Sequence, residues 1–190
     1  MRLGIFGGSF DPPHVGHLLA AIDAFEALAL DRLIFVPAAI QPLKEGRASA
    51  SPEQRFQMVR HLVEADGRFD VDPIEIHRSG LSYTVDTLES FARRFPGGER
   101  FFLVGADAMA TFSAWREPER IVGLAQLAIL RRPGLTVEAG SVPREAISLP
   151  TRLIDVSSTE IRERVRSGRS IRGFVPESVA RFVETEQLYR

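Results

Sequence analysis

The sequence lacks several features that would each place the protein in a particular class. It contains no cysteine among its 190 residues, which excludes a disulfide framework and a thiolate metal site. No apolar run approaches the roughly 20 residues that cross a bilayer, because even residues 124–130 are followed directly by Arg131 and Arg132. The formal net charge of -1 gives no general positive field for nucleic acid. We therefore expect neither a membrane span nor a nucleic-acid partner.

The N-terminus also lacks the apolar region of a signal peptide, since Arg2 leads directly into residues typical of a strand. We expect a cytoplasmic protein on this basis. What is present is ordinary for a globular protein, with 44% hydrophobic and 26% charged residues. A chain of this length can bury a sizeable core, so we expect one domain covering residues 1–190.

Short apolar runs, bounded by glycine, proline or aspartate, alternate with stretches of helical periodicity. The runs are residues 3–6, 33–36, 101–104, 127–130 and 153–156. Each is typical of a buried parallel strand. The clearest helical stretches lie between them, at residues 15–25 and 83–95. This alternation predicts an α/β fold: a single-domain, doubly wound, Rossmann-like parallel sheet with helices on both faces, and ligands beyond the carboxyl ends of its strands.

Capping residues mark two further helix starts. Ser51 and Gln54 have the spacing of a capping box, and the helix that follows is expected to bury Phe56, Val59, Leu62 and Val63. Ser157 and Glu160 have the same spacing directly after the last predicted strand.

Two histidines and three glycines lie in the segment GGSFDPPHVGH, residues 7–17, which we call the first motif. The segment joins the first predicted strand to the first helix. Glycine lets the backbone approach a phosphate closely, and the free N–H groups of a helix start favour an anion. His14 and His17 are three residues apart, so both imidazoles can face one ligand, and Gly16 leaves room between them. The glycine spacing matches neither a Walker A loop nor a dinucleotide fingerprint.

Two other interpretations of the first motif stay open at this point. The histidines could simply cap a helix or face solvent. They could also form half of a metal site, although the only other histidines are His61, in a predicted mid-helix position, and His77.

The first motif resembles the G-x-F-D-P-x-H-x-G-H signature of the nucleotidyltransferase superfamily, and every motif position matches. The resemblance implies that His14 and His17 contact a triphosphate, with His17 nearest the α-phosphate. In such a nucleotidyl transfer the attacking phosphate is already ionised near neutral pH. The reaction therefore needs positioning and charge neutralisation more than a general base, and Mg²⁺ carried with ATP would contribute to both. The other residues that the resemblance assigns to ATP binding in this segment are Gly8, Ser9, Phe10 and Gly16.

The second motif, residues 156–162 (VSSTEIR), follows the last predicted strand. By itself it is only a helix cap, but hydroxyls and amides at a helix start can also hold a phosphate. It resembles the I-S-S-T-x-x-R element of the same superfamily. The resemblance implies that Ser157, Ser158 and Thr159 grip the β- and γ-phosphates, and that Arg162 joins the two histidines as a catalytic residue.

Three further segments resemble the bacterial nicotinate-nucleotide adenylyltransferase family. They are SYTVDTL at residues 82–88, GAD at residues 105–107 with Trp115 beyond it, and RPG at residues 132–134. The resemblance implies transfer of the adenylyl group of ATP to nicotinate mononucleotide, in the biosynthesis of NAD. Trp115 would stack on the pyridine ring, and the segment of Tyr83 and Thr84 would hold the nicotinate carboxylate. Gly105 and Asp107 would belong to the ATP site, Asp107 through the ribose.

The loop around Lys44 departs from the family pattern. Lys44 resembles the lysine of the family's P-x-x-x-P-P-H-K loop and is therefore expected to bind substrate. However, Leu43 occupies the position of the usual histidine, and Gln41 that of the first proline of the pair.

The alternatives come from inside and outside the superfamily. Pantetheine-phosphate adenylyltransferase shares both phosphate motifs but typically carries threonine where His14 stands, and it lacks the S-Y-T-x-D-T-L segment. A cytidylyltransferase and a non-catalytic nucleotide-binding regulator are further alternatives. The expected partners are ATP and nicotinate mononucleotide, and a homo-oligomer is an open alternative to a monomer.

Overall fold

A single parallel sheet organises the computed structural model, which describes residues 1–40, 50–78, 80–131, 143, 146–152 and 154–190. Its six strands are arranged in the order β3-β2-β1-β4-β5-β6, and each neighbouring pair is parallel. The strands are β1 (Arg2–Gly8), β2 (Arg32–Pro37), β3 (Phe69–Val71), β4 (Glu99–Gly105), β5 (Gln126–Leu130) and β6 (Ile147–Leu149). This order is that of a doubly wound sheet, so the predicted fold class is confirmed.

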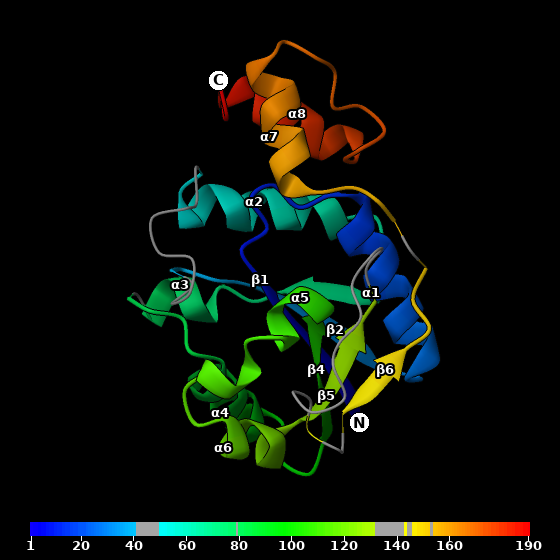
Figure 1. Ribbon diagram of the computed structural model, residues 1–190, viewed down its shortest axis with the longest axis vertical. Coiled ribbons are helices and arrows are strands. Elements are labelled where there is room, and N and C mark those ends of the chain that lie inside the picture. Colours follow the sequence, from blue (N-terminus) through cyan, green and yellow to red (C-terminus); the bar gives the residue numbers. More distant parts are fainter. Residues whose placement is uncertain (41–49, 79, 132–142, 144–145, 153) are drawn as a thin grey trace.

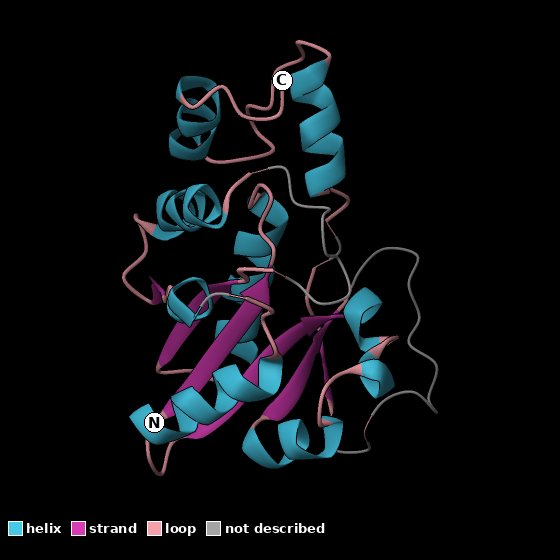
Figure 2. Ribbon diagram, turned by 90° about the vertical axis from the view of Figure 1, so that its left-hand side faces the viewer, coloured by secondary structure: helices cyan, strands magenta, loops and turns pink. Residues whose placement is uncertain are grey.

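Helices cover both faces of the sheet (Figures 1 and 2). Successive residues of a strand point to opposite faces. Leu33 and Phe35 of β2 therefore pack in one core cluster, and Ile34 and Val36 in another. The first cluster includes buried residues of α1 (Val15–Ala27), α2 (Pro52–Val63), α7 (Ser158–Arg166) and α8 (Glu177–Thr185). The second includes α4 (Thr84–Arg94), α5 (Ala106–Met109), the 3-10 turn η2 (Phe112–Ala114) and α6 (Pro118–Leu124). The short α3 (Ile74–Arg78) follows β3.

The last two helices return to the N-terminal half of the chain. In Figure 1, α7 and α8 lie together beyond α2, on the side away from α4 and α6. The hydroxyl of Ser178 in α8 donates to the carbonyl of His61 in α2 at 2.9 Å. The N–H of Val15, at the start of α1, donates to the carbonyl of Phe174 at 2.9 Å. The fold thus brings the segment after β6 against the start of α1.

One predicted strand is wrong. Residues 154–156 belong to no helix or strand, and Leu153 lies outside the described residues. The sixth strand is instead Ile147–Leu149, which pairs with β5. Pro150 follows it and has no N–H to continue the ladder, so this edge strand ends there. The predicted strands over residues 3–6, 33–36, 101–104 and 127–130 are confirmed, whereas the three-residue β3 was not predicted.

The predicted helix at Ser51 begins as expected, and it buries Val59, Leu62 and Val63 as predicted but not Phe56. Ser51 and Gln54 form the reciprocal capping box. Phe56 is only partly buried, while Arg55 is 1% exposed and lies with the buried residues of α2. At the second predicted start, the hydroxyl of Ser157 accepts from the N–H of Glu160 at 3.1 Å. Among the described residues, none of the helices combines the length and apolar character that crossing a bilayer requires.

Candidate active site

A cavity of about 800 Å³ opens at the carboxyl ends of β1, β2, β4 and β5. This is where a doubly wound sheet binds its ligands, because the strand order reverses between β1 and β4. All the residues predicted for catalysis or ATP binding line this cavity: Gly8, Ser9, Phe10, His14, Gly16, His17, Gly105, Asp107, Ser157, Ser158, Thr159 and Arg162.

The first motif is shaped by close packing of its backbone against aromatic rings. Phe10 has a positive φ of 50° and buries its ring, which meets the rings of Phe6 at 5.5 Å and His17 at 5.1 Å. A Cβ atom at Gly8 would lie 2.9 Å from the Phe10 ring, so only glycine fits there. A Cβ atom at Gly16 would lie 3.0 Å from Nδ1 of His14. A side chain at Gly8 would therefore displace the Phe10 ring, and one at Gly16 would press on the His14 ring.

The rings of the two histidines lie against each other in a tilted arrangement at the start of α1. Their ring centroids are 3.8 Å apart, at an interplanar angle of 36°. His14 is the N-cap residue and is buried, and its backbone N–H donates to Nδ1 of His17 at 3.2 Å. Because Nδ1 of His17 accepts this bond, the proton of the neutral ring lies on Nε2. The geometry therefore makes Nε2 of His17 a hydrogen-bond donor.

The second motif is bonded directly to the first. The hydroxyl of Ser158 donates to the carbonyl of Pro12 at 2.8 Å, and Nη1 of Arg162 donates to the carbonyl of Asp11 at 2.7 Å. Nη2 of Arg162 also contacts the hydroxyl of Thr159 at 3.2 Å. Two segments from opposite ends of the chain thus share one wall of the cavity.

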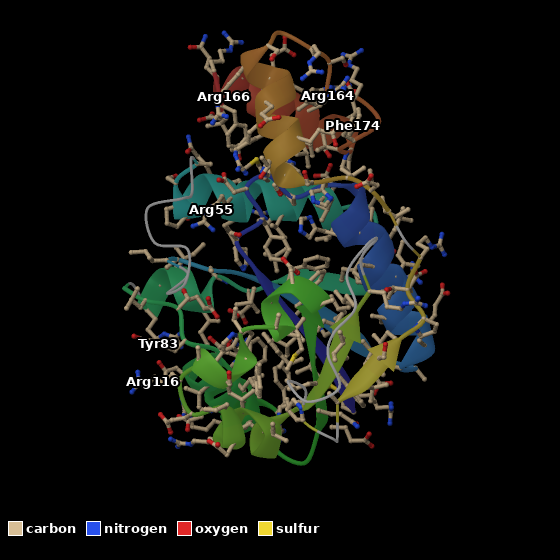
Figure 3. The ribbon with its side chains drawn as sticks, in the orientation of Figure 1. Arg55, Tyr83, Arg116, Arg164, Arg166 and Phe174 are labelled. Atoms are coloured by element: carbon tan, nitrogen blue, oxygen red, sulfur yellow. The ribbon has the colours of Figure 1, made fainter. Side chains whose placement is uncertain are left out.

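The other arginines of this region have different roles. The guanidinium of Arg164 lies 4.3 Å from the ring centroid of Phe174 and donates to the carbonyl of Ser170 (Figure 3). Arg166 is exposed at the end of α7. Neither residue lines the cavity, in contrast to Arg162.

A buried arginine that we did not predict also lines the cavity. Arg55 of α2 (Figure 3) donates to three backbone carbonyls: Ser9 at 2.7 Å, Ala39 at 2.9 Å and Ala50 at 3.3 Å. These carbonyls belong to loops that follow β1 and β2 and precede α2. Burial lowers the pKa of the Arg55 guanidinium, and the nearby carboxylate of Asp11 opposes that effect. Arg55 therefore ties the segment after β1 to both ends of the connection between β2 and α2 with one side chain.

The three predicted acceptor-binding residues that the structure describes, Tyr83, Thr84 and Trp115, do not line this cavity. Tyr83 is the N-cap residue of α4, with the Arg116 guanidinium 4.8 Å from its ring centroid (Figure 3), and Thr84 is the first residue of that helix. The Trp115 ring packs against Phe112, with centroids 5.5 Å apart. Lys44 lies outside the described residues, as do residues 132–134.

The acceptor segment is nevertheless tied to the rim of the cavity. The hydroxyl of Ser82 accepts from the N–H of Ala39 at 2.9 Å, and the N–H of Ser82 donates to the carbonyl of Ile40 at 2.8 Å. Ala39 and Ile40 both line the cavity. Tyr83 and Thr84 therefore follow directly after a residue that is bonded to the cavity rim.

Known proteins with similar sequences identify the family of this chain. The Cytidylyltransferase-like family model matches residues 5–164. A relative from Gemmatimonas aurantiaca is 50% identical over 100% of this chain and 93% of its own length, and one from Thermus thermophilus is 47% identical over the full length of both chains. Each carries the name "Probable nicotinate-nucleotide adenylyltransferase".

A solved structure shows the same fold at lower identity. It is the Plasmodium falciparum nicotinic acid mononucleotide adenylyltransferase complexed with NaAD, with a TM-score of 0.79 and 19% identity over 99% of this chain and 97% of that one. The matched family model, the full-length relatives and the joined phosphate motifs lead to one conclusion. This chain belongs to the bacterial nicotinate-nucleotide adenylyltransferase family of cytidylyltransferase-like proteins.

Proposed function

We propose that this chain transfers the adenylyl group of ATP to nicotinate mononucleotide, forming nicotinate adenine dinucleotide and pyrophosphate. The observation that carries the proposal is the joining of two phosphate motifs at one cavity, by a hydrogen bond between residues 146 positions apart. The choice of acceptor is supported by the relatives that are named for it and that match the whole chain.

The reaction requires little covalent chemistry from the protein. An oxygen of the acceptor phosphate attacks the α-phosphorus of ATP and forms a P–O bond. The bond from that phosphorus to the oxygen bridging the β-phosphate breaks, and its electron pair leaves with pyrophosphate. Because the acceptor phosphate is ionised near neutral pH, no side chain has to remove a proton from it. The protein therefore contributes position and charge neutralisation.

His17 suits the α-phosphate because the transfer increases negative charge on its oxygens. Nε2 carries the proton, since Nδ1 accepts from the N–H of His14. A donor already aimed at developing charge lowers the barrier without reorganising during the reaction. The ring of His14 packs against the His17 imidazole and restrains it, with centroids 3.8 Å apart.

The second motif suits the leaving pyrophosphate. The nine-residue α7 begins at Ser158 with its N–H groups at the cavity, and the hydroxyls of Ser158 and Thr159 add donors. Arg162 supplies a permanent positive charge from the next turn. We expect these groups to hold the β- and γ-phosphates while the bond to the α-phosphate breaks.

Mg²⁺ fits this site as a companion of ATP rather than as a resident ion. Among the described residues there is no group of three or more His, Asp or Glu side chains that could hold a metal. The donors that line the cavity are mainly N–H groups and hydroxyls, which suit phosphate oxygens. An Mg²⁺ ion carried with ATP would neutralise charge on the leaving group while the donors of the cavity hold the phosphates. We expect activity to vanish with excess chelator and to return with Mg²⁺, and full activity in chelator would contradict this assignment.

The acceptor side rests on Tyr83, Thr84, Trp115 and Lys44. We propose that the N–H groups at the start of α4 receive the nicotinate carboxylate, and that the indole of Trp115 stacks on the cationic pyridine ring. Lys44 would contact an acceptor or ATP phosphate from its loop.

The deciding experiment measures pyrophosphate release from ATP with nicotinate mononucleotide, with pantetheine phosphate and without an acceptor. We expect release only with nicotinate mononucleotide. Release with pantetheine phosphate would assign the chain to the rival activity. Binding of ATP without release in any arm would indicate a regulator.

A further inference from the structure

A tyrosine far from both motifs donates a hydrogen bond into the active-site loop. The hydroxyl of Tyr189, which follows α8, donates to Oδ1 of Asp11 at 2.7 Å across 178 residues of sequence. Both residues are buried, with 7% of Tyr189 and 4% of Asp11 exposed. Asp11 lies in the first motif and lines the cavity.

Asp11 stands between Tyr189 and Arg162. Its Oδ1 also accepts from the N–H of Ala50 at 3.1 Å, and its Oδ2 lies 4.0 Å from Nη1 of Arg162. The same Nη1 donates to the backbone carbonyl of Asp11 at 2.7 Å. The position of this carboxylate therefore sets the electrostatic pull on one edge of the Arg162 guanidinium.

The backbone around Tyr189 adopts a conformation that residues with side chains rarely adopt. Gln187 has a φ of 51° and Tyr189 a φ of 64°, both in the left-handed region. The N–H of Leu188 donates to the carbonyl of Val183 at 3.0 Å, so the chain turns back at the end of α8. Phenylalanine would fill the same core volume without a polar atom, and a buried hydroxyl needs a partner. The hydroxyl is thus the part of Tyr189 that apolar packing does not explain.

The direction of this hydrogen bond is fixed. Burial, and next the neighbouring carboxylate of Asp11, raise the pKa of the Tyr189 hydroxyl well above its ordinary value. The hydroxyl stays protonated near neutral pH and donates to the carboxylate. The cations that face this pair are Arg55 and Arg162.

We propose that Tyr189 is a positioning residue for Arg162 and therefore for the triphosphate of ATP. Its hydroxyl restrains the Asp11 carboxylate at a distance from the guanidinium, so that Arg162 keeps donors directed at phosphate. Without the hydroxyl, the carboxylate can turn toward Arg162 and compete with the phosphate for those donors. The turnover readout rests on the adenylyl transfer proposed above, whereas ATP binding tests the proposal independently of the acceptor.

The test is a double-mutant cycle on ATP affinity, measured calorimetrically with Mg²⁺ and an ATP analogue that has a methylene group between the α- and β-phosphates. We expect Tyr189→Phe to weaken binding about tenfold, the typical effect of losing a hydrogen bond to a charged group. In an Arg162→Ala background the same change should weaken binding less than about twofold, because the residue it acts through is gone. Equal weakening in both backgrounds, or none in either, would overturn the proposal.

The matched control is Val183→Ala, a change in a buried residue of α8 that loses packing but no hydrogen bond to the loop. It should lower the melting temperature while leaving ATP affinity within about twofold of the parent. If it weakens ATP binding as much as Tyr189→Phe, general loss of packing explains both effects and the proposal fails.

Asp11→Asn provides a second variant if Tyr189→Phe does not fold. Asparagine retains an oxygen for the tyrosine hydroxyl but removes the charge that faces Arg162. We expect this variant to bind ATP more tightly than the parent, because no carboxylate then pulls on the guanidinium, and to change binding by less than about twofold in the Arg162→Ala background. Weaker ATP binding by Asp11→Asn would contradict the proposal. Equal effects in both backgrounds would again contradict the mechanism. Absence of turnover with nicotinate mononucleotide would reject the proposed acceptor only, because the binding cycle contains none.

Discussion

The proposed phosphate side, which consists of the two motifs, and the proposed acceptor side, which consists of Tyr83, Thr84 and Trp115, use their side chains differently. On the phosphate side, Ser158 and Arg162 donate to backbone carbonyls of the first motif, and both motifs line the cavity. On the acceptor side, Tyr83 and Trp115 contact other protein side chains, namely Arg116 and Phe112. Neither aromatic residue is part of the cavity lining within the described residues.

This difference has a physical basis. Phosphate recognition relies on helix starts and backbone N–H groups, and the fold fixes these as soon as the strands pair. Recognition of the pyridine ring relies on aromatic side chains, which already gain packing energy from their neighbours. A ligand on that side has to compete with protein contacts. We therefore expect changes on the phosphate side to alter turnover most, and changes on the acceptor side to alter affinity and selectivity.

Arg55 joins the two sides, because it bonds to Ser9 of the first motif and to Ala39, whose N–H donates to Ser82 next to Tyr83. We expect its removal to have the largest effect. The guanidinium of Arg55 donates to the carbonyls of Ser9, Ala39 and Ala50, and Arg55→Met removes all three hydrogen bonds. An unsatisfied buried polar group costs about 1 to 3 kcal/mol, so we expect the free energy of unfolding to fall by about 3 kcal/mol or more. Urea denaturation measures this quantity. The control is Arg60→Met, an exposed arginine on the same helix, and an equal loss there would contradict the role of Arg55.

Removing the α-phosphate donor should have the next largest effect. His17→Ala should lower kcat about 100-fold or more while leaving ATP affinity comparatively intact, because the contact strengthens as charge develops. Steady-state kinetics and calorimetric ATP binding separate the two quantities. His61→Ala is a matched control, since His61 lies in α2 away from the cavity lining. Near-normal turnover of His17→Ala would contradict the assignment of His17 as the donor to the α-phosphate.

Selectivity between acceptors should show a smaller effect on the other side. A carboxylate only accepts hydrogen bonds, so the N–H groups at the start of α4 suit nicotinate, whereas the amide of nicotinamide turns an NH₂ group toward those donors. A mismatched polar group in a closed pocket costs about 1 to 3 kcal/mol. We therefore expect kcat/KM to favour nicotinate mononucleotide about 10-fold to 100-fold.

The Trp115→Ala variant separates stacking from this selectivity. Both rings present the same cationic face to an indole, so the variant should weaken both mononucleotides to a similar extent and leave their ratio unchanged. Equal kcat/KM values for the two acceptors in the parent protein, or a ratio that collapses in Trp115→Ala, would show that the pocket has been misinterpreted.

Sequence patterns predicted which residues of the two motifs come together at the cavity, because each motif is local in sequence. Each motif is a short segment that begins where a strand or loop meets a helix, and the fold class follows from the alternation of strands and helices. The strand over residues 153–156 was wrong because two neighbouring apolar segments compete for the edge of the sheet. Pairing with β5 selects Ile147–Leu149, while Ile154 and Val156 line the cavity instead.

Arg55 and Tyr189 could not be identified from local patterns alone. Arg55 bonds to three carbonyls in two connections that are separate in sequence, and Tyr189 bonds to a residue 178 positions away. One signal for Arg55 was present: it precedes Met58, Val59 and Leu62 by three, four and seven residues, so it occupies the buried stripe of the helix. The predicted stripe was correct at Val59, Leu62 and Val63 but included Phe56 where the structure buries Arg55.

A buried carboxylate under the acceptor segment offers a final, smaller test of the acceptor side. Glu75 is 7% exposed, and its Oε1 accepts from the hydroxyl of Thr87 at 2.7 Å. It also interacts with the hydroxyl of Ser82, which accepts a hydrogen bond from the N–H of Ala39. Burial raises the pKa of the Glu75 carboxyl above its ordinary value of 4.5, although hydrogen bonds from Thr87 and Ser82 act in the opposite direction.

The sign of the resulting pH effect follows from proton linkage. Between the ordinary value of 4.5 and the raised pKa, the folded protein binds more protons at Glu75 than the unfolded chain does. The free energy of unfolding contributed by this group therefore falls as pH rises through that window, and it is constant on either side. Glu75→Gln has no titrating group there, so the parent should lose stability relative to the variant as pH rises. Urea unfolding of both proteins in steps from acid to neutral pH measures the difference. If the difference in unfolding free energy grows in the parent's favour with rising pH, the neighbours of Glu75 stabilise its charged form. If the difference does not change with pH, burial does not shift the pKa of Glu75. Either result would contradict the expectation.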